Sequence, residues 1–121
     1  MLQLAEETKM RIDTRRTSDV TILDLHSQMR ITDGGLDLQK KVQELLDAGE
    51  KKILLNVQNV RQVDSFGVGQ LVICYRTATK QGGQLKFFNL TGRLYKLLTI
   101  TNLLTVFDTF ESEEKAIASF S

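Results

Sequence analysis

The sequence predicts an α/β domain built on a mixed sheet, in which the later strands are parallel and an N-terminal strand is antiparallel. Three observations support this fold class. After an opening hairpin, segments of strand character alternate with segments of helical periodicity to the end of the chain. The connections are short, which is typical of parallel strands joined by right-handed helical crossovers. The chain of 121 residues is long enough for one core and too short for two ordinary domains.

Two strands are predicted first, at residues 9–16 and 20–27, with the sequences KMRIDTRR and VTILDLHS. The TSD segment between them is turn-forming, so the two strands are expected to make an antiparallel hairpin. The residues before the hairpin are polar. We therefore expect residues 1–8 to be a frayed N-terminal extension and residues 9–121 to form a single domain.

The first helix is predicted to begin at Leu36 and to stop at Gly49, a typical C-terminal residue. Its apolar side chains recur at nearly helical spacing, at positions 36, 38, 42, 45 and 46. The next segment, KILLNV at residues 52–57, is a dense aliphatic run of the kind found in strands that are buried on both faces. We therefore expect helices on both sides of this strand.

The remaining elements follow the same alternation. A second helix is predicted between residues 66 and 80, with apolar or small residues at positions 68, 71, 72, 75, 78 and 79 and a glycine pair after it. A strand is then predicted at residues 84–90, a helix at 92–100 and a strand at 105–110. Ser112 is the expected N-cap of a last helix at residues 113–120, which brings the total to about four helices.

Composition excludes several functional classes. Opposite charges nearly balance, with 16 Lys and Arg against 15 Asp and Glu, so no direct nucleic-acid partner is expected. The single cysteine, Cys74, cannot form an intramolecular disulfide, and no Cys/His cluster has the spacing of metal ligands. We therefore expect no metal and no cofactor.

The sequence has neither a secretory signal pattern nor an apolar segment of ~20 residues, so we expect a cytoplasmic protein without membrane insertion.

The candidate site is the VDSFG segment, where a strand ends and a helix begins. Asp64 or Ser65 could simply cap the helix. Alternatively, Ser65 is a phosphorylation site, because the free N–H groups and the dipole of a helix N-terminus can receive a phosphate. A catalytic serine would need a base, and His26, in a strand pattern, is the only imidazole of the chain. We therefore expect no catalytic residues and no enzymatic activity.

The outer face of the second helix is the candidate docking surface. At 100° per residue, Phe66 and Ile73 are expected to point away from the core, alongside Gly69, Gln70, Arg76 and Thr77. Isolated exposed apolar groups are common, so this face could be without function. In the functional interpretation, Phe66 and Ile73 are anchors, Gly69 permits close approach of a partner, and Ser65 lies at the edge.

These residues resemble the anti-sigma factor antagonist group of the STAS family. The similarity runs from about residue 9 to the end, and its most specific parts are VDSFGVG at 63–69, KQGGQLK at 80–86 and NLTGRLYKLLTITNL at 89–103. The resemblance implies a mixed sheet packed with helices and a non-enzymatic protein that binds an anti-sigma factor serine kinase. It also implies that Ser65, directly after Asp64, is the phosphoacceptor, and that a serine phosphatase acting on phospho-Ser65 restores binding.

Two departures from the family pattern concern the choice of partner. Phe66 stands where the family usually has a second hydroxyl residue. The SQMR segment at residues 27–30 replaces a Gly-Glu-aliphatic-Asp stretch, so that Gln28 and Arg30 take the place of two acids. If that segment belongs to the docking surface, as the family suggests, Gln28 and Arg30 contact the partner and alter the charge that it meets.

Two other functions stay open on sequence. The chain could be a constitutive STAS adaptor of a stressosome-like or membrane-transport assembly, in which Ser65 is only a helix cap. An enzyme or small-ligand binder would instead need a concave polar pocket near residues 26–34 and 64–67.

Overall fold

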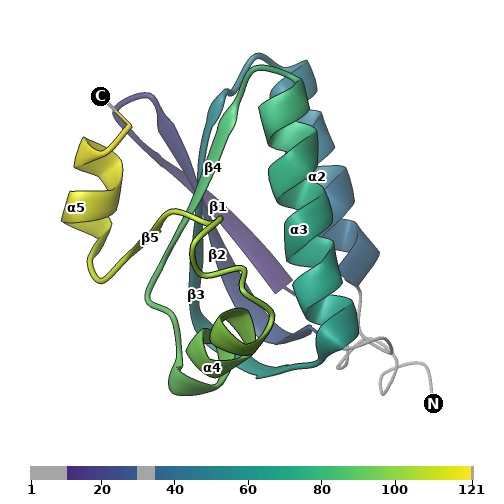
Figure 1. Ribbon diagram of the computed structural model, residues 1–121. Coiled ribbons are helices and arrows are strands. Elements are labelled where there is room, and N and C mark those ends of the chain that lie inside the picture. The colour runs from purple at the N-terminus through teal and green to yellow at the C-terminus, as the bar shows by residue number, and fades with distance from the viewer. Residues whose placement is uncertain (1–10, 30–34, 121) are drawn as a thin grey trace.

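Five strands form one mixed sheet, and helices pack against its faces in the computed structural model, which describes residues 11–29 and 35–120 (Figure 1). The order of the strands across the sheet is the order along the chain, β1-β2-β3-β4-β5. The strands are β1 (Arg11–Thr17), β2 (Val20–Met29), β3 (Lys52–Val63), β4 (Gln84–Phe88) and β5 (Thr109–Phe110). The helices are α2 (Gly35–Asp47), α3 (Ser65–Lys80), α4 (Gly92–Ile100) and α5 (Glu113–Ala118).

The pairing of the strands confirms the predicted fold class. β1 and β2 are antiparallel, with Thr14 opposite Leu23. Ser18, in the turn between them, has a φ of 57°, a conformation that tight turns require and that bulky residues avoid. The pairs β2–β3, β3–β4 and β4–β5 are parallel. The expected antiparallel hairpin and parallel later strands are therefore both present.

The core lies on both faces of the sheet. In Figure 1, α2 and α3 lie side by side on one face, and α5 lies on the other. Leu54 and Leu55 are adjacent in β3 and point to opposite faces, yet both are fully buried. Leu55 belongs to the larger cluster, which includes Leu71 of α3, and Leu54 packs in a smaller cluster with Ala116 of α5. The prediction that this strand is covered on both sides is confirmed.

The ends of two strands differ from the predictions. β3 continues to Val63, because residues after the aliphatic run pair with the end of β2, Ser27 with Val60 and Met29 with Val63. The last strand is shorter than predicted and starts only at Thr109. The segment before it folds as a turn, in which the N–H of Phe107 donates to the carbonyl of Leu103 at 3.0 Å.

Smaller differences concern the ends of other elements. The predicted start of the first strand, at residues 9 and 10, lies outside the described residues. The strand predicted at 84–90 ends at Phe88, because Asn89 turns the chain with a φ of 64°. The helix predicted at 113–120 ends at Ala118, and Ser112 is its N-cap as expected.

Candidate functional site

The candidate site lies at the edge of the sheet where the parallel strands end. β3 ends at Val63 and α3 begins at Ser65, so Asp64 alone separates the strand from the helix. Asp64 has extended backbone angles (φ −118°, ψ −175°), and its Oδ1 accepts a hydrogen bond from the N–H of Gly67 at 3.0 Å. This is the geometry of an N-cap. Asp64 is therefore the capping residue, and capping does not require the hydroxyl of Ser65.

Ser65 is the first residue of α3 and is exposed. The first N–H groups of a helix have no partners within the helix, and the aligned peptide dipoles place positive potential at this end. A phosphate on Ser65 would lie in that potential without entering the core. The geometry of this residue therefore permits phosphorylation of the folded protein.

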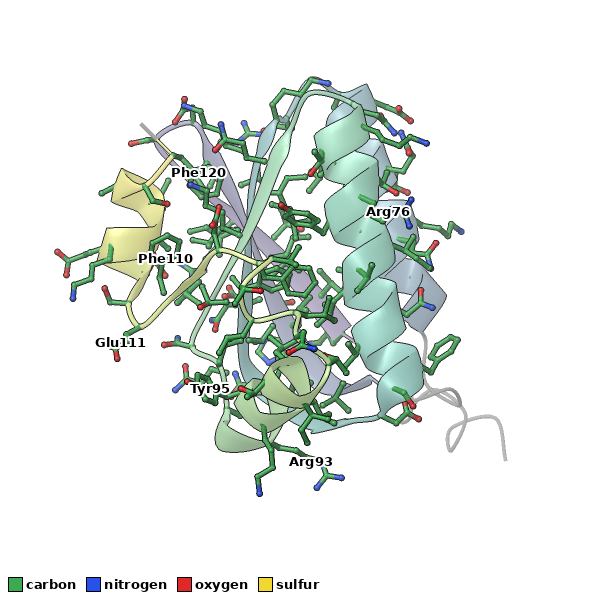
Figure 2. The ribbon with its side chains drawn as sticks, viewed as in Figure 1. Arg76, Arg93, Tyr95, Phe110, Glu111 and Phe120 are labelled. Carbon is green, nitrogen blue, oxygen red and sulfur yellow. The ribbon has the colours of Figure 1, made fainter. Side chains whose placement is uncertain are left out.

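One face of α3 carries three of the residues predicted to bind a partner, Phe66, Gly69 and Ile73. The side chain of Ile73 is 43% exposed, Phe66 is half-buried and Arg76 is exposed, and Figure 2 labels Arg76 on this helix. A Cβ placed on Gly69 would meet no atom within 4 Å beyond its chain neighbours and the nearby backbone of its own helix. We call Phe66, Gly69, Ile73 and Arg76 the α3 surface.

The predicted orientation of α3 is wrong at Gln70. We expected Gln70 to point outward, but it is only 5% exposed, because α2 packs alongside α3 and Gln39 of α2 donates a hydrogen bond to its side-chain oxygen. Conversely, Thr79 was expected to face the core and is exposed. The sequence gives no sign that a neighbouring helix supplies a hydrogen-bond partner to a polar residue. The periodic pattern therefore did not predict the contact between Gln39 and Gln70.

The end of β2 meets the same edge of the sheet. Gln28 pairs with Gln62, and Met29 pairs with Val63 next to Asp64. The backbone position of Gln28 is therefore close to the start of α3 along the sheet. Arg30 lies outside the described residues, so its predicted role remains a prediction.

His26 has partners on neighbouring strands. Its Nε2 is 3.0 Å from Oδ2 of Asp13 on β1, and its Nδ1 is 3.4 Å from Nδ2 of Asn59 on β3. Both ring nitrogens are thus engaged within the sheet. This arrangement supports a structural role for His26 and does not favour a role as the base of a catalytic serine.

Three other features bear on the chemistry of the part of the chain that the structure describes. Within it, no group of three His, Cys, Asp or Glu side chains could hold a metal ion, and none of the helices combines the length and the hydrophobicity of a membrane span. Burial raises the pKa of Cys74 to about 12. A thiol with this pKa is almost entirely protonated at neutral pH and is a poor nucleophile.

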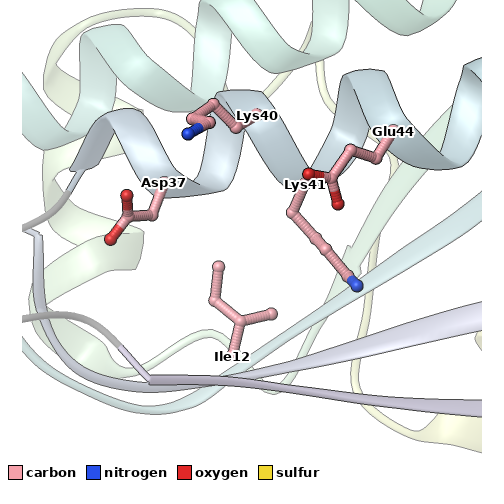
Figure 3. Close-up of a pocket in the computed structure, with 5 residues that line it drawn as sticks. All are labelled: Ile12, Asp37, Lys40, Lys41 and Glu44. Atoms are coloured by element: carbon pink, nitrogen blue, oxygen red, sulfur yellow. The ribbon is translucent and has the colours of Figure 1, made fainter.

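A hollow with charged walls lies between β1 and α2 (Figure 3), and the residues that line it come from these two elements. Ile12 lies opposite α2 in this hollow, which has a volume of about 310 Å³. The helix side carries two acidic side chains, Asp37 and Glu44, and two basic ones, Lys40 and Lys41. Mixed charges of this kind are typical of a solvated helix face, so this hollow does not indicate an enzyme site.

A family model described as the STAS domain matches residues 11–116. The anti-sigma-B factor antagonist of Bacillus subtilis is 32% identical over 80 residues, which cover 66% of this chain and 72% of that protein.

Solved structures share the fold at lower identity. The crystal structure of a candidate anti-sigma factor antagonist of Thermotoga maritima has a TM-score of 0.82 at 24% identity and covers 89% of this chain and 92% of that chain. Phosphorylated SpoIIAA of Bacillus has a TM-score of 0.70 at 17% identity and covers 92% of this chain and all of that one. The murine anion transporter Slc26a9 matches 97% of this chain with 23% of its own length, at a TM-score of 0.80 and 17% identity.

Proposed function

Because the chain belongs to the STAS domain family, we propose that it is an anti-sigma factor antagonist whose binding is switched by phosphorylation of Ser65. The partner is an anti-sigma factor with serine kinase activity, which binds the unphosphorylated protein. Phosphorylation of Ser65 releases the partner, and a serine phosphatase restores binding. These partners belong to the bacterial cytoplasm, and the chain itself performs no catalysis.

The observation that carries this proposal is the exposed Ser65 on the first turn of α3, beside an α3 surface with an exposed Ile73. Asp64 already caps the helix, so modification of Ser65 leaves the fold intact. The similarity to a protein named anti-sigma-B factor antagonist supports the partner class. SpoIIAA, which shares the fold, is known in a phosphorylated form.

The expected size of the switch follows from electrostatics. A phosphate adds about −1.5 to −2 charges at neutral pH. At ~6 Å from one acidic group of a partner, this charge costs about 1.5 to 5 kcal/mol for effective dielectrics between bulk water and a protein surface. The affinity would fall by about one to three decades or more, which is enough to exchange partners.

Partner contacts are proposed for six residues. Phe66 and Ile73 act as apolar anchors, and Gly69 allows a partner backbone to approach. Asp64 lies beside the phosphoacceptor. Gln28 and Arg30 continue the contact surface from the end of β2 and set its charge.

The test measures binding of candidate serine-kinase anti-sigma factors from the same genome by titration calorimetry. We expect Ser65→Asp to weaken binding at least about tenfold, because it places a permanent charge at the edge of the interface. Ser65→Ala should bind normally, and its intact mass should not increase when kinase and ATP are added.

Ser112→Asp is the matched control. It adds the same charge at a helix N-terminus on the other face of the sheet, and aspartate keeps the N-cap acceptor. Binding should be unchanged. If Ser65→Asp and the phosphorylated protein both bind as tightly as the parent, the switch is refuted, and a constitutive STAS adaptor becomes the better interpretation.

A further inference from the structure

A second hollow lies between α4 and β5. It has a volume of about 480 Å³ and is lined by Asn89, Leu90, Tyr95, Thr109, Phe110 and Glu111. Figure 2 shows Tyr95, Phe110 and Glu111 on the side of the molecule away from α3. The volume lies in the range of ligand pockets, which is ~300 to 1,000 Å³. The hollow is therefore large enough for a side chain together with part of its backbone.

The charge of this lining favours a cation. Glu111 is exposed and is the one charged residue among the six that line the hollow. Lys86 lies outside this lining, with its Nζ 5.9 Å from the ring centroid of Phe110, and is held by two hydrogen bonds of 3.0 Å to Ser119. An anion would meet Glu111 without a compensating positive group in the lining, whereas a cation would be paired.

The aromatic side chains restrict the shape of the cation. Tyr95 is 53% exposed, and Phe110, which belongs to the same lining, is half-buried. Rings of this kind attract a cation over their faces. A guanidinium group is planar, stacks on aromatic faces and is less strongly hydrated than an ammonium group, so it gains more from this environment.

Asn89 supplies a fixed polar group to the hollow. Its Nδ2 donates to Oδ1 of Asn56 at 3.3 Å and to Oε1 of Gln58 at 3.4 Å, and its backbone N–H donates to the carbonyl of Phe110 at 3.2 Å. The side-chain N–H groups of Asn89 thus both donate to residues of β3. Among the described residues, none donates to Oδ1 of Asn89, so this oxygen can accept a hydrogen bond from a ligand.

We propose that this hollow binds an arginine side chain of a partner protein, at a surface separate from the α3 surface. Glu111 accepts hydrogen bonds from the guanidinium group, Oδ1 of Asn89 accepts another, and Tyr95 and Phe110 contact its plane. Free arginine fits less well, because its α-carboxylate would find no cationic side chain among the described residues of the lining. This arginine would then bind whatever the phosphorylation state of Ser65.

The test is an NMR titration of the 15N-labelled full chain with N-acetyl-arginine methylamide, without any kinase. We expect saturable shifts at the backbone amides of residues 89, 90, 95 and 109–111. Glu111→Gln should weaken binding about tenfold, the usual effect of losing one charge-assisted hydrogen bond. Tyr95→Phe should keep the affinity, and Tyr95→Ala should lower it.

Two controls test whether binding depends on the charge of Glu111 and on the positive charge of the ligand. Glu114→Gln removes an exposed acid three positions along the chain and should leave the affinity unchanged. The neutral citrulline analogue should bind at least about tenfold more weakly. The proposal is overturned if the shifts do not saturate or map elsewhere, if Glu111→Gln has no effect, or if the citrulline analogue binds equally well. Tighter binding of free arginine would overturn the choice of a protein partner.

Discussion

At the residue scale, Asp64 and Ser65 are neighbours with different tasks. The carboxylate of Asp64 accepts the hydrogen bond from Gly67 that starts α3, and Ser65 follows as the exposed first residue of the helix. An N-cap acceptor stabilises a helix by satisfying an orphan N–H group. The proposed phosphorylation of Ser65 would therefore leave the capping hydrogen bond of Asp64 in place.

Because Asp64 caps the helix and Ser65 does not, substitutions of these two residues should have unequal effects on stability. Asp64→Ala should lower the free energy of unfolding by about 1 kcal/mol, since alanine supplies no acceptor. Ser65→Ala should change it by less than about 0.5 kcal/mol, as expected for an exposed residue. Urea denaturation measures both.

Asp64→Ser is the control for this prediction. Serine is also a good N-cap residue, so this variant should retain most of the parent's stability. An equal or larger loss in Ser65→Ala would show that its hydroxyl, and not the carboxylate of Asp64, stabilises the helix end.

At the scale of the element, one side of α3 packs in the core and the other side is exposed. Val68, Leu71, Cys74 and Ala78 are buried in the core. On the exposed side, Gly69 stands in the interior of a 16-residue helix with open space where a Cβ would lie. A glycine there destabilises the helix, and the fold itself offers no packing reason for it.

Gly69→Ala therefore separates stability from binding. The variant should raise the free energy of unfolding by up to ~1 kcal/mol, because alanine is the better helix former and the added methyl group meets no neighbour. If the α3 surface is the docking surface, the same variant should weaken binding of the anti-sigma partner. Thermal unfolding and titration calorimetry give the two numbers.

Thr79→Ala is a suitable control, because Thr79 is exposed near the other end of α3. This variant should leave partner binding unchanged. A Gly69→Ala protein that is stabilised and binds normally would remove Gly69 from the docking surface.

At the scale of the whole molecule, Arg15 joins three elements. Its guanidinium group contacts Asp24 of β2 at 2.6 Å and Glu113 of α5 at 2.7 Å. Asn56 of β3 also donates to Asp24, at 2.8 Å. Partial burial raises the pKa of Asp24, but the hydrogen bonds from Arg15 and Asn56 outweigh it, so the pKa lies below its ordinary value.

The lowered pKa of Asp24 predicts a loss of stability in acid. The unfolded chain binds a proton at Asp24 near pH 4, whereas the folded protein does so only at lower pH. The stabilisation is therefore complete above the unfolded pKa and is lost as the pH falls through the folded pKa. Asp24→Asn should be less stable at neutral pH, and its stability should fall less steeply below about pH 4.

Urea denaturation as a function of pH provides the measurement, with Asp108→Asn as an exposed control whose profile should follow that of the parent. Parallel profiles of Asp24→Asn and the parent below about pH 4 would show that the Arg15 network does not couple protonation to folding.

The sequence predicted most of the fold, because the signals for it are local. The aliphatic run from residue 52, the glycines that end helices and the capping residue Ser112 each act within a few positions of the chain. The sequence also placed Ser65 at a helix start. It did not distinguish whether Asp64 or Ser65 caps the helix, since both side chains can accept the hydrogen bond.

What the sequence by itself determined is the fold class, the family and the position of Ser65 at the start of α3. Only the tertiary structure decided the length of β3, the burial of Gln70 and the hollow that joins Asn89, Tyr95 and Glu111. The physical reason is distance along the chain. β3 extends because β2 pairs with it, and Gln70 is buried because α2 covers it. The hollow forms where residues 89–95 and 109–111 come together, and no local sequence pattern relates these two segments.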